Sequence, residues 1–153
     1  AYYSDPYKYF ENPVSVTIKY TIPNFARVGN KTMIFKTLTA NGVFSYAQIY
    51  DSWPTEPNER KFSFAGNCSQ KVDIVENISL PKKGKLINQT EYCAKNSGKY
   101  ASIETNAELK GKNLCIKSAE RFEQRIYPAE AWPEFIKLQE IKNNFRQPLI
   151  VKF

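Results

Sequence analysis

The sequence predicts a mainly β fold, an antiparallel β-sandwich with one short α-helix near the C-terminus. Apolar side chains recur at every second position in several short runs, which is the period of a half-buried strand. Turn-forming residues separate these runs at short intervals, as they do in sandwiches. Helical spacing of apolar residues is evident between residues 126 and 145. Together these observations favour two stacked sheets over a helical or mixed fold.

The clearest strand signal is VSVTIKYTI, at residues 14–22. Its apolar and polar side chains alternate strictly, so we expect one face of this strand to be buried and the other to face water. Pro23 and Asn24 end the run, since proline cannot donate a backbone hydrogen bond. A second strand is expected at 32–38, after a turn that begins at Gly29.

The middle of the chain continues the same pattern. The Asn-Gly pair at 41–42 is a strong turn signal before a β-rich run at 43–50. Two prolines and many polar residues predict a loop at 51–60. Two more strands are expected at 61–66 and 71–80. The shared apolar face of the last run consists of Val72, Ile74, Ile78 and Leu80.

A long β-hairpin is predicted in the C-terminal half. Residues 100–109 and 114–126 both alternate, and KGKN at 110–113 supplies the turn between them. The number of strands and the short turns are typical of an immunoglobulin- or fibronectin-like sandwich. No internal linker is evident, so we expect residues 1–153 to form a single domain. The side chains in phase on the second strand are Leu114, Ile116, Phe122 and Ile126.

The predicted helix follows this hairpin. Pro133 suits the first turn of a helix, where its missing N–H group would lack a partner anyway, and Glu134 beside it favours the helix dipole. Trp132 precedes the helix and is placed to pack on the sheet. Pro148 stops the helix, and LIVKF at 149–153 predicts a last strand. The apolar stripe of the helix is Phe135, Leu138 and Ile141.

Composition excludes several classes of protein. Twenty-two Lys and Arg outnumber fifteen Asp and Glu, which gives a formal net charge of +7. The basic residues are scattered, so we expect no nucleic-acid partner. No apolar run is long enough to span a membrane. The opening AYYSDPYKYF has no initiator Met and no signal pattern, which suggests a processed protein or a piece of a longer one. The short basic clusters are Lys82, Lys83 and Lys85, and Lys110, Lys112 and Lys117.

No enzyme chemistry is expected of these residues. Cys68, Cys93 and Cys115 lie more than twenty residues apart, and the chain contains no His that could activate a thiol or bind zinc. One disulfide with a free thiol is possible, and so are three thiols. We therefore expect no catalytic residue, no metal and no cofactor. The carboxylate pairs Glu56 with Glu59 and Glu130 with Glu134 are expected to be surface charges.

The segment YPAEAWPEF at 127–135 resembles the closing signature of certain bacterial transglutaminase-like proteins. The resemblance extends to Leu80 and Pro81 and to the aromatic-rich opening, and so covers most of the chain. Here Ala131 takes the place of an acidic residue and Trp132 that of a tyrosine. The residues of this structural signature are Tyr127, Pro128, Trp132, Pro133 and Phe135.

This resemblance implies a C-terminal β-sandwich domain of unknown function within a multidomain protein. The central domain of that family has the fold of papain-like cysteine proteases and holds the catalytic Cys, His and Asp, none of which matches a motif in this chain. The resemblance thus implies a non-catalytic accessory domain that packs against an upstream transglutaminase-like domain. It also implies export to the periplasm, the cell surface or the medium.

Two groups of aromatic residues are candidate contact surfaces. Exposed rings can stack on sugars or peptides, which makes a carbohydrate- or peptide-binding module the alternative function. Rings in the opening residues are too numerous for a free tail and predict contact with a neighbouring domain. The candidate ligand-binding residues are Tyr46, Tyr50 and Trp53. The candidate interdomain residues are Tyr2, Tyr3, Tyr7, Tyr9 and Phe10.

Overall fold

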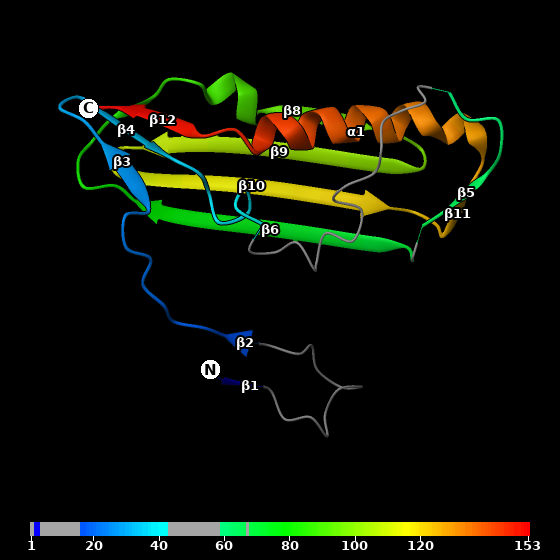
Figure 1. Cartoon of the computed structure of the whole chain (residues 1–153), viewed down its shortest axis with the longest axis horizontal. Helices are drawn as coiled ribbons and strands as arrows, with labels where there is room; N and C mark the ends of the chain where they lie inside the picture. The colour runs from blue at the N-terminus through cyan, green and yellow to red at the C-terminus, as the bar shows by residue number, and fades with distance from the viewer. Residues whose placement is uncertain (1, 4–15, 43–58, 67) are drawn as a thin grey trace.

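The computed structural model describes residues 2–3, 16–42, 59–66 and 68–153. In this part of the chain the structure is mainly antiparallel β-sheet with one α-helix, which confirms the predicted fold class (Figure 1). Two four-stranded sheets and the helix α1 form the body of the molecule.

The first sheet has the order β6-β10-β9-β8 and is called the long sheet below. The strands β10 (Asn113–Phe122) and β9 (Ala101–Lys110) form the predicted hairpin and pair over ten residues each. On the other side of β10 lies β6 (Gln70–Ser79), which pairs with it over ten residues without a bulge. The shorter strand β8 (Ala94–Ser97) forms the opposite edge, beside β9.

The second sheet has the order β3-β4-β12-β7. Its strands come from distant parts of the chain, because β12 (Leu149–Lys152) pairs both with β4 (Thr32–Phe35) and with β7 (Lys85–Leu86). The edge strand β3 (Ala26–Val28) pairs with β4. The last strand predicted from LIVKF is therefore confirmed, and it lies in the middle of this sheet.

The helix α1 (Trp132–Phe145) begins with Pro133 in its first turn, as predicted. It follows a short 3₁₀ turn, η3 (Ala129–Ala131), and packs on β9 and β8. Its buried side chains include the whole predicted stripe. These side chains are Trp132, Phe135, Leu138, Gln139, Ile141, Lys142 and Phe145.

One face of the long sheet carries two apolar clusters, one after the other. The helix cluster joins Ile103 and Phe122 of the sheet to the buried side chains of α1 from Trp132 to Ile141. The sheet cluster joins Leu114 and Ile116 to the second sheet, including Leu149. The two sheets thus stack over half of this face, and the helix takes the place of the second sheet over the other half.

The opposite face of the long sheet is polar. Its outward-pointing side chains alternate with the buried ones along each strand, as the period of two requires. Exposed ion pairs join Lys95 to Glu104 and Lys71 to Asp73 on this face. Such surface pairs each contribute only about 0–1 kcal/mol, so the face is held mainly by the backbone ladder beneath it.

Three predictions about strands need correction. The strand expected at 14–22 is limited to β2 (Val16–Thr17) among the described residues, where it pairs with β1 (Tyr2–Tyr3) apart from the body (Figure 1). The strand expected at 61–66 shrinks to β5 (Phe64–Ala65). Ile126 lies in a separate strand, β11 (Ile126–Tyr127), and is 64% exposed because β10 ends at Phe122 and the phase is lost. The run at 43–50 lies outside the described residues.

Candidate functional site

A row of buried polar side chains separates the two apolar clusters and is called the polar seam below. On β10, Ser118 and Glu120 stand between Ile116 of the sheet cluster and Phe122 of the helix cluster. Thr105 has the same position on β9. Burying polar groups costs free energy unless they are hydrogen-bonded, so each charge in the seam requires a partner. The members of the polar seam are Thr37, Thr39, Glu76, Thr105, Ser118, Glu120 and Lys142.

Glu120 and Lys142 form an ion pair inside the protein. The Lys142 Nζ atom lies 2.9 Å from the Glu120 Oε2 atom, and their side chains are only 4% and 2% exposed. Taking both charges out of water is costly, and their attraction compensates only when the geometry is good. This pair ties α1 to β10, and it occupies the two charges that would otherwise be candidates for acid–base chemistry.

Glu76 of β6 binds the turn that follows β4. Its carboxylate accepts hydrogen bonds from the backbone N–H of Leu38 at 2.8 Å and of Thr39 at 2.9 Å, and from the Thr39 hydroxyl. The Thr37 hydroxyl oxygen in turn accepts a hydrogen bond from the N–H of Ala40 at 2.9 Å. Glu76 is therefore a structural anchor for residues 37–40, with both carboxylate oxygens engaged.

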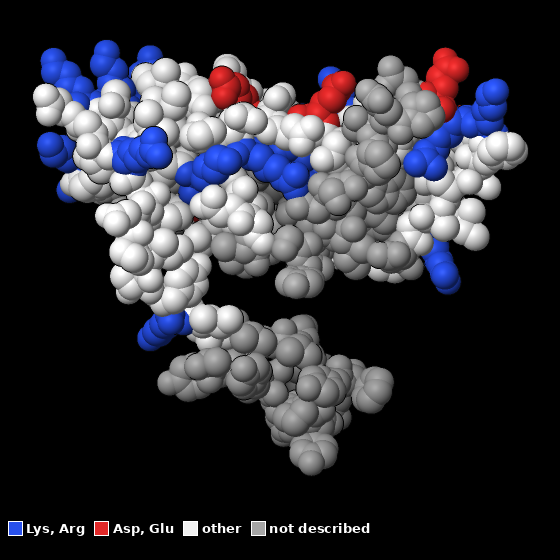
Figure 2. Space-filling model, in the orientation of Figure 1, with Lys and Arg blue, Asp and Glu red and all other residues white. Residues whose placement is uncertain are grey.

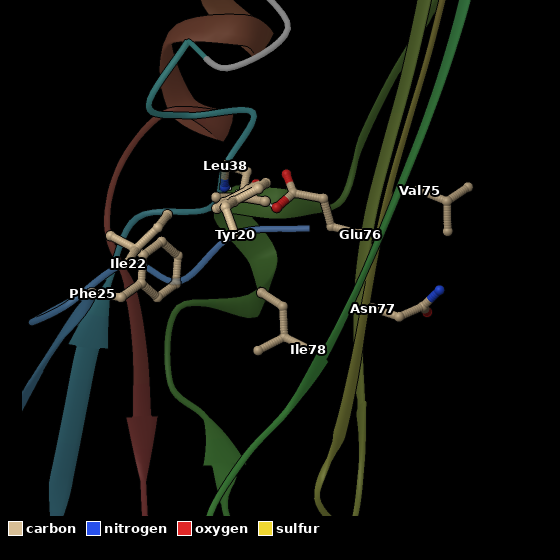
Figure 3. A pocket seen from close by; sticks show the side chains of 8 residues that line it. All are labelled: Tyr20, Ile22, Phe25, Leu38, Val75, Glu76, Asn77 and Ile78. Atoms are coloured by element: carbon tan, nitrogen blue, oxygen red, sulfur yellow. Dashed lines mark hydrogen bonds between the residues drawn. The ribbon is translucent and has the colours of Figure 1, made fainter. Parts of the chain in front are cut away.

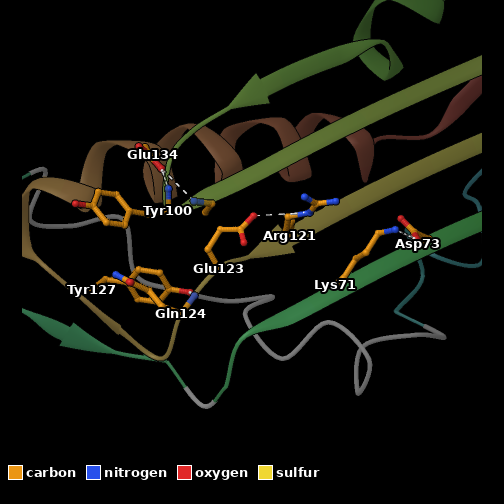
Figure 4. Close-up of polar contacts among 9 residues, drawn as sticks. Lys71, Asp73, Tyr100, Arg121, Glu123, Gln124, Tyr127 and Glu134 are labelled. Carbon is orange, nitrogen blue, oxygen red and sulfur yellow. Dashed lines mark hydrogen bonds and ion pairs between the residues drawn. The ribbon is translucent and has the colours of Figure 1, made fainter.

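Glu134, expected to be a surface charge, is half-buried and caps the connection between β8 and β9. Its carboxylate accepts hydrogen bonds from the backbone N–H groups of Tyr100 at 2.8 Å (Figure 4), and of Lys99 at 3.1 Å and Ala101 at 3.0 Å. Gly98 is needed beside it, because a Cβ atom there would lie 2.5 Å from the Ala101 carbonyl oxygen and would also collide with the Glu134 carboxylate. This capping role is a function that the sequence pattern did not indicate.

Replacing Glu134 with alanine is expected to lower the free energy of unfolding by about 2–3 kcal/mol, since three N–H groups lose a charged acceptor. Urea denaturation followed by circular dichroism measures this loss. Glu130→Ala is the matched control because Glu130 is exposed, and it should change the free energy by less than about 0.5 kcal/mol. Equal effects of the two substitutions would contradict the capping role.

The predicted signature 127–135 forms an aromatic cluster. Tyr127, Trp132 and Phe135 are buried, and the ring of Phe64 lies 5.3 Å from both Tyr127 and Trp132 and 5.1 Å from Phe135, measured between ring centroids. The Arg60 guanidinium lies 4.0 Å from the centroid of the Trp132 ring, a cation–π contact. These rings pack against one another, so the signature residues carry the attachment of the helix to the sheet.

The short 3₁₀ turn η2 (Gln89–Tyr92) closes one open side between the two sheets. Tyr92 is fully buried there and donates a hydrogen bond from its hydroxyl to the Gln147 carbonyl oxygen. Burial, followed by the negative charges of Glu91 and Glu76, raises the pKa of the Tyr92 phenol above its ordinary value. Tyr92 therefore stays protonated, as its role as a donor requires.

The opposite open side, between β3 and β6, holds a cavity of about 510 Å³. Its walls are mostly apolar and come from β6, from the segment before β3 and from the turn after β4 (Figure 3). A volume of this size falls within the range of ligand sites, roughly 300–1,000 Å³. The lining residues are Tyr20, Ile22, Phe25, Leu38, Val75, Glu76, Asn77 and Ile78.

The remaining candidate groups do not assemble into a site. Cys68 and Cys93 are exposed and Cys115 is half-buried, and no disulfide joins these three described thiols. Within the described ranges, no group of three metal-binding side chains occurs. No helix of this part of the chain has the length and apolar character needed to cross a membrane. Figure 2 shows Lys and Arg spread along the displayed face in separate groups rather than in one patch.

The predicted contact residues are not tested by this structure. Tyr46, Tyr50 and Trp53 lie outside the described residues, and so do Tyr7, Tyr9 and Phe10. Tyr2 and Tyr3 are described by their backbone pairing with Thr17 and Val16. Both candidate surfaces thus stay predictions.

The polar seam could have been detected from the sequence. Glu76 is in phase with the apolar residues Ile74 and Ile78, and Glu120 is in phase with Ile116 and Phe122. A charge at a position that the alternation assigns to the core indicates a buried and paired group. Nothing in the pattern indicates its partner, because Lys142 lies on another element.

The chain shares its fold with part of a larger protein. No family model matches the chain, and no curated protein matches it. A crystal structure of "a putative protease" from Parabacteroides distasonis superposes with a TM-score of 0.59 and 10% sequence identity. The match covers 82% of this chain but 24% of that chain, so the shared fold is about a quarter of a longer protein.

Proposed function

We propose that this chain is a non-catalytic accessory domain that packs against a transglutaminase-like catalytic domain of an exported bacterial protein. The observation that carries the proposal is that the buried charged side chains serve to hold the fold together. Glu76 holds a turn, and Glu120 and Lys142 hold the helix on the sheet. These three buried charges, which acid–base work would require to be available, are engaged in maintaining the fold.

Two further observations support this proposal. The sequence contains no His, so neither Cys93 nor Cys115 has the usual activating base. The fold is shared with a quarter of the longer chain described as "a putative protease", which is the relation expected of an accessory domain. The resemblance of 127–135 to the transglutaminase-like family is the basis for proposing a transglutaminase-like neighbouring domain and an exported location.

The aromatic residues at the start of the chain are the proposed contact with that neighbour. The test uses the 153-residue chain and the upstream transglutaminase-like domain, produced as separate polypeptides and mixed before size-exclusion chromatography. We expect the two to elute together, and removal of residues 1–10 to weaken the complex at least about tenfold, as for loss of an aromatic hot spot.

Ile126→Ser is the control for this experiment, because Ile126 is an exposed apolar side chain of β11, near α1, and not part of the aromatic N-terminal stretch. It should leave the affinity unchanged. Separate elution of the two intact polypeptides at high concentration would overturn the proposal. Binding that survives the removal of residues 1–10 would refute the assigned surface.

A further inference from the structure

The two open sides of the stacked sheets are closed differently. On the side of β7 and β8, η2 links the sheets: the Gln89 side chain donates to the Ala107 carbonyl oxygen, and Tyr92 is fully buried. On the side of β3 and β6, no element of the described chain takes the equivalent place, and the 510 Å³ cavity lies there instead. The second side is therefore incomplete.

The outer edge of β6 is suited to receive another strand. Within the described ranges β6 pairs with β10 alone, and its ten residues contain no Pro, no Gly and no bulge. Such interruptions are among the devices that proteins use to protect an edge from pairing. The half of β6 beside the cavity also exposes an apolar side chain, Val75.

A segment with the matching pattern lies next to this edge. Residues 18–22, called the strap below, alternate apolar and polar side chains but form no strand. Ile18, Tyr20 and Ile22 are 66%, 54% and 42% exposed, which is unusual for three apolar side chains on one face of a strand pattern. Tyr20 and Ile22 already line the cavity opposite β6, with Tyr20 near Glu76 and Ile22 near Phe25 (Figure 3).

We propose that the strap closes as an additional strand along the outer edge of β6, with Ile18, Tyr20 and Ile22 turned into the cavity. Closure gives β6, which pairs with β10 alone among the described strands, a second strand partner, and it buries three apolar side chains together. The polar residues Lys19 and Thr21 then face outward. The movement is short, because the strap already forms one wall of the cavity.

Hydrogen–deuterium exchange of the intact chain, read by mass spectrometry, tests this closure. In the closed form, amides of the strap and of the outer edge of β6 are hydrogen-bonded and should exchange at least about tenfold more slowly than in an unstructured chain. Ile22→Asp places a charge in the cavity and should remove this protection. Thr21→Asp is the matched control, with the same change of charge on the opposite face, and should keep it.

A second measurement uses Nile red, a neutral fluorescent probe of accessible apolar surface. The closed strap leaves little room for the probe, so we expect the Ile22→Asp variant to bind more of it than the original chain or Thr21→Asp. Unprotected strap amides in the original chain would overturn the proposal. Equal protection of β6 in both variants, or equal binding of the probe by all three proteins, would overturn it as well.

Discussion

Replacing Trp132 with alanine is expected to lower the free energy of unfolding by about 3–5 kcal/mol, the usual cost of removing a large buried aromatic side chain. Trp132 is 1% exposed, and its ring contacts those of Phe64 and Phe135. The substitution leaves a cavity where the helix meets the sheet, and it also removes the ring face on which Arg60 lies. A loss of this size is a large part of the net stability of a domain, about 5–15 kcal/mol.

Urea denaturation monitored by far-ultraviolet circular dichroism measures this change, with Phe62→Ala as the control. Phe62 is also aromatic but is 81% exposed, so its removal should cost less than about 0.5 kcal/mol. A Trp132→Ala protein as stable as the control would show that the signature segment does not anchor the helix. Hydrogen exchange of the α1 amides should increase more in the variant than that of the β9 amides, because Trp132 anchors the first turn of the helix to the sheet.

The second large effect is expected at the buried ion pair. Lys142→Met removes the cation 2.9 Å from Glu120 and leaves the carboxylate in a buried site without this partner. Breaking a buried pair from one side costs about 3–5 kcal/mol. Replacing both residues, as Glu120→Leu with Lys142→Met, should restore most of that loss, because similar volumes of apolar side chain need no compensation for desolvation.

A double-mutant cycle of denaturation experiments measures the coupling between the two positions. We expect the double variant to be more stable than either single variant. If the effects of the single substitutions simply add, the two side chains act independently and the pair does not hold α1 on β10. The exposed pair Lys137 and Glu140 provides the comparison, with an expected coupling within about 0–1 kcal/mol.

The regular elements with strong local patterns were predictable from the sequence. The hairpin of β9 and β10 was predicted because both strands alternate over ten residues around one turn. The start of α1 was predicted because Pro133 and the apolar stripe agree. In these segments, the secondary structure that the local sequence favours is also the one that buries the apolar side chains in the folded chain.

The failures lie where burial depends on distant residues. The alternation of 14–22 predicts a strand, but a strand also needs a partner, and the described structure supplies one only for Val16 and Thr17. Ile126 was predicted to share the buried face of Phe122, but the chain leaves the long sheet between these two residues, so the alternation does not continue. The capping role of Glu134 was not predicted because the amides that it caps lie more than thirty residues away in sequence.

The polar seam has a consequence for how the protein comes apart. It divides the hydrophobic core into two parts, and separate parts of a core often unfold independently. Here β9 and β10 pass without interruption from one to the other and contribute side chains to both. Both parts of the core thus depend on the same two strands, and neither can unfold without disrupting the strands that support the other. The two should therefore unfold in a single cooperative transition.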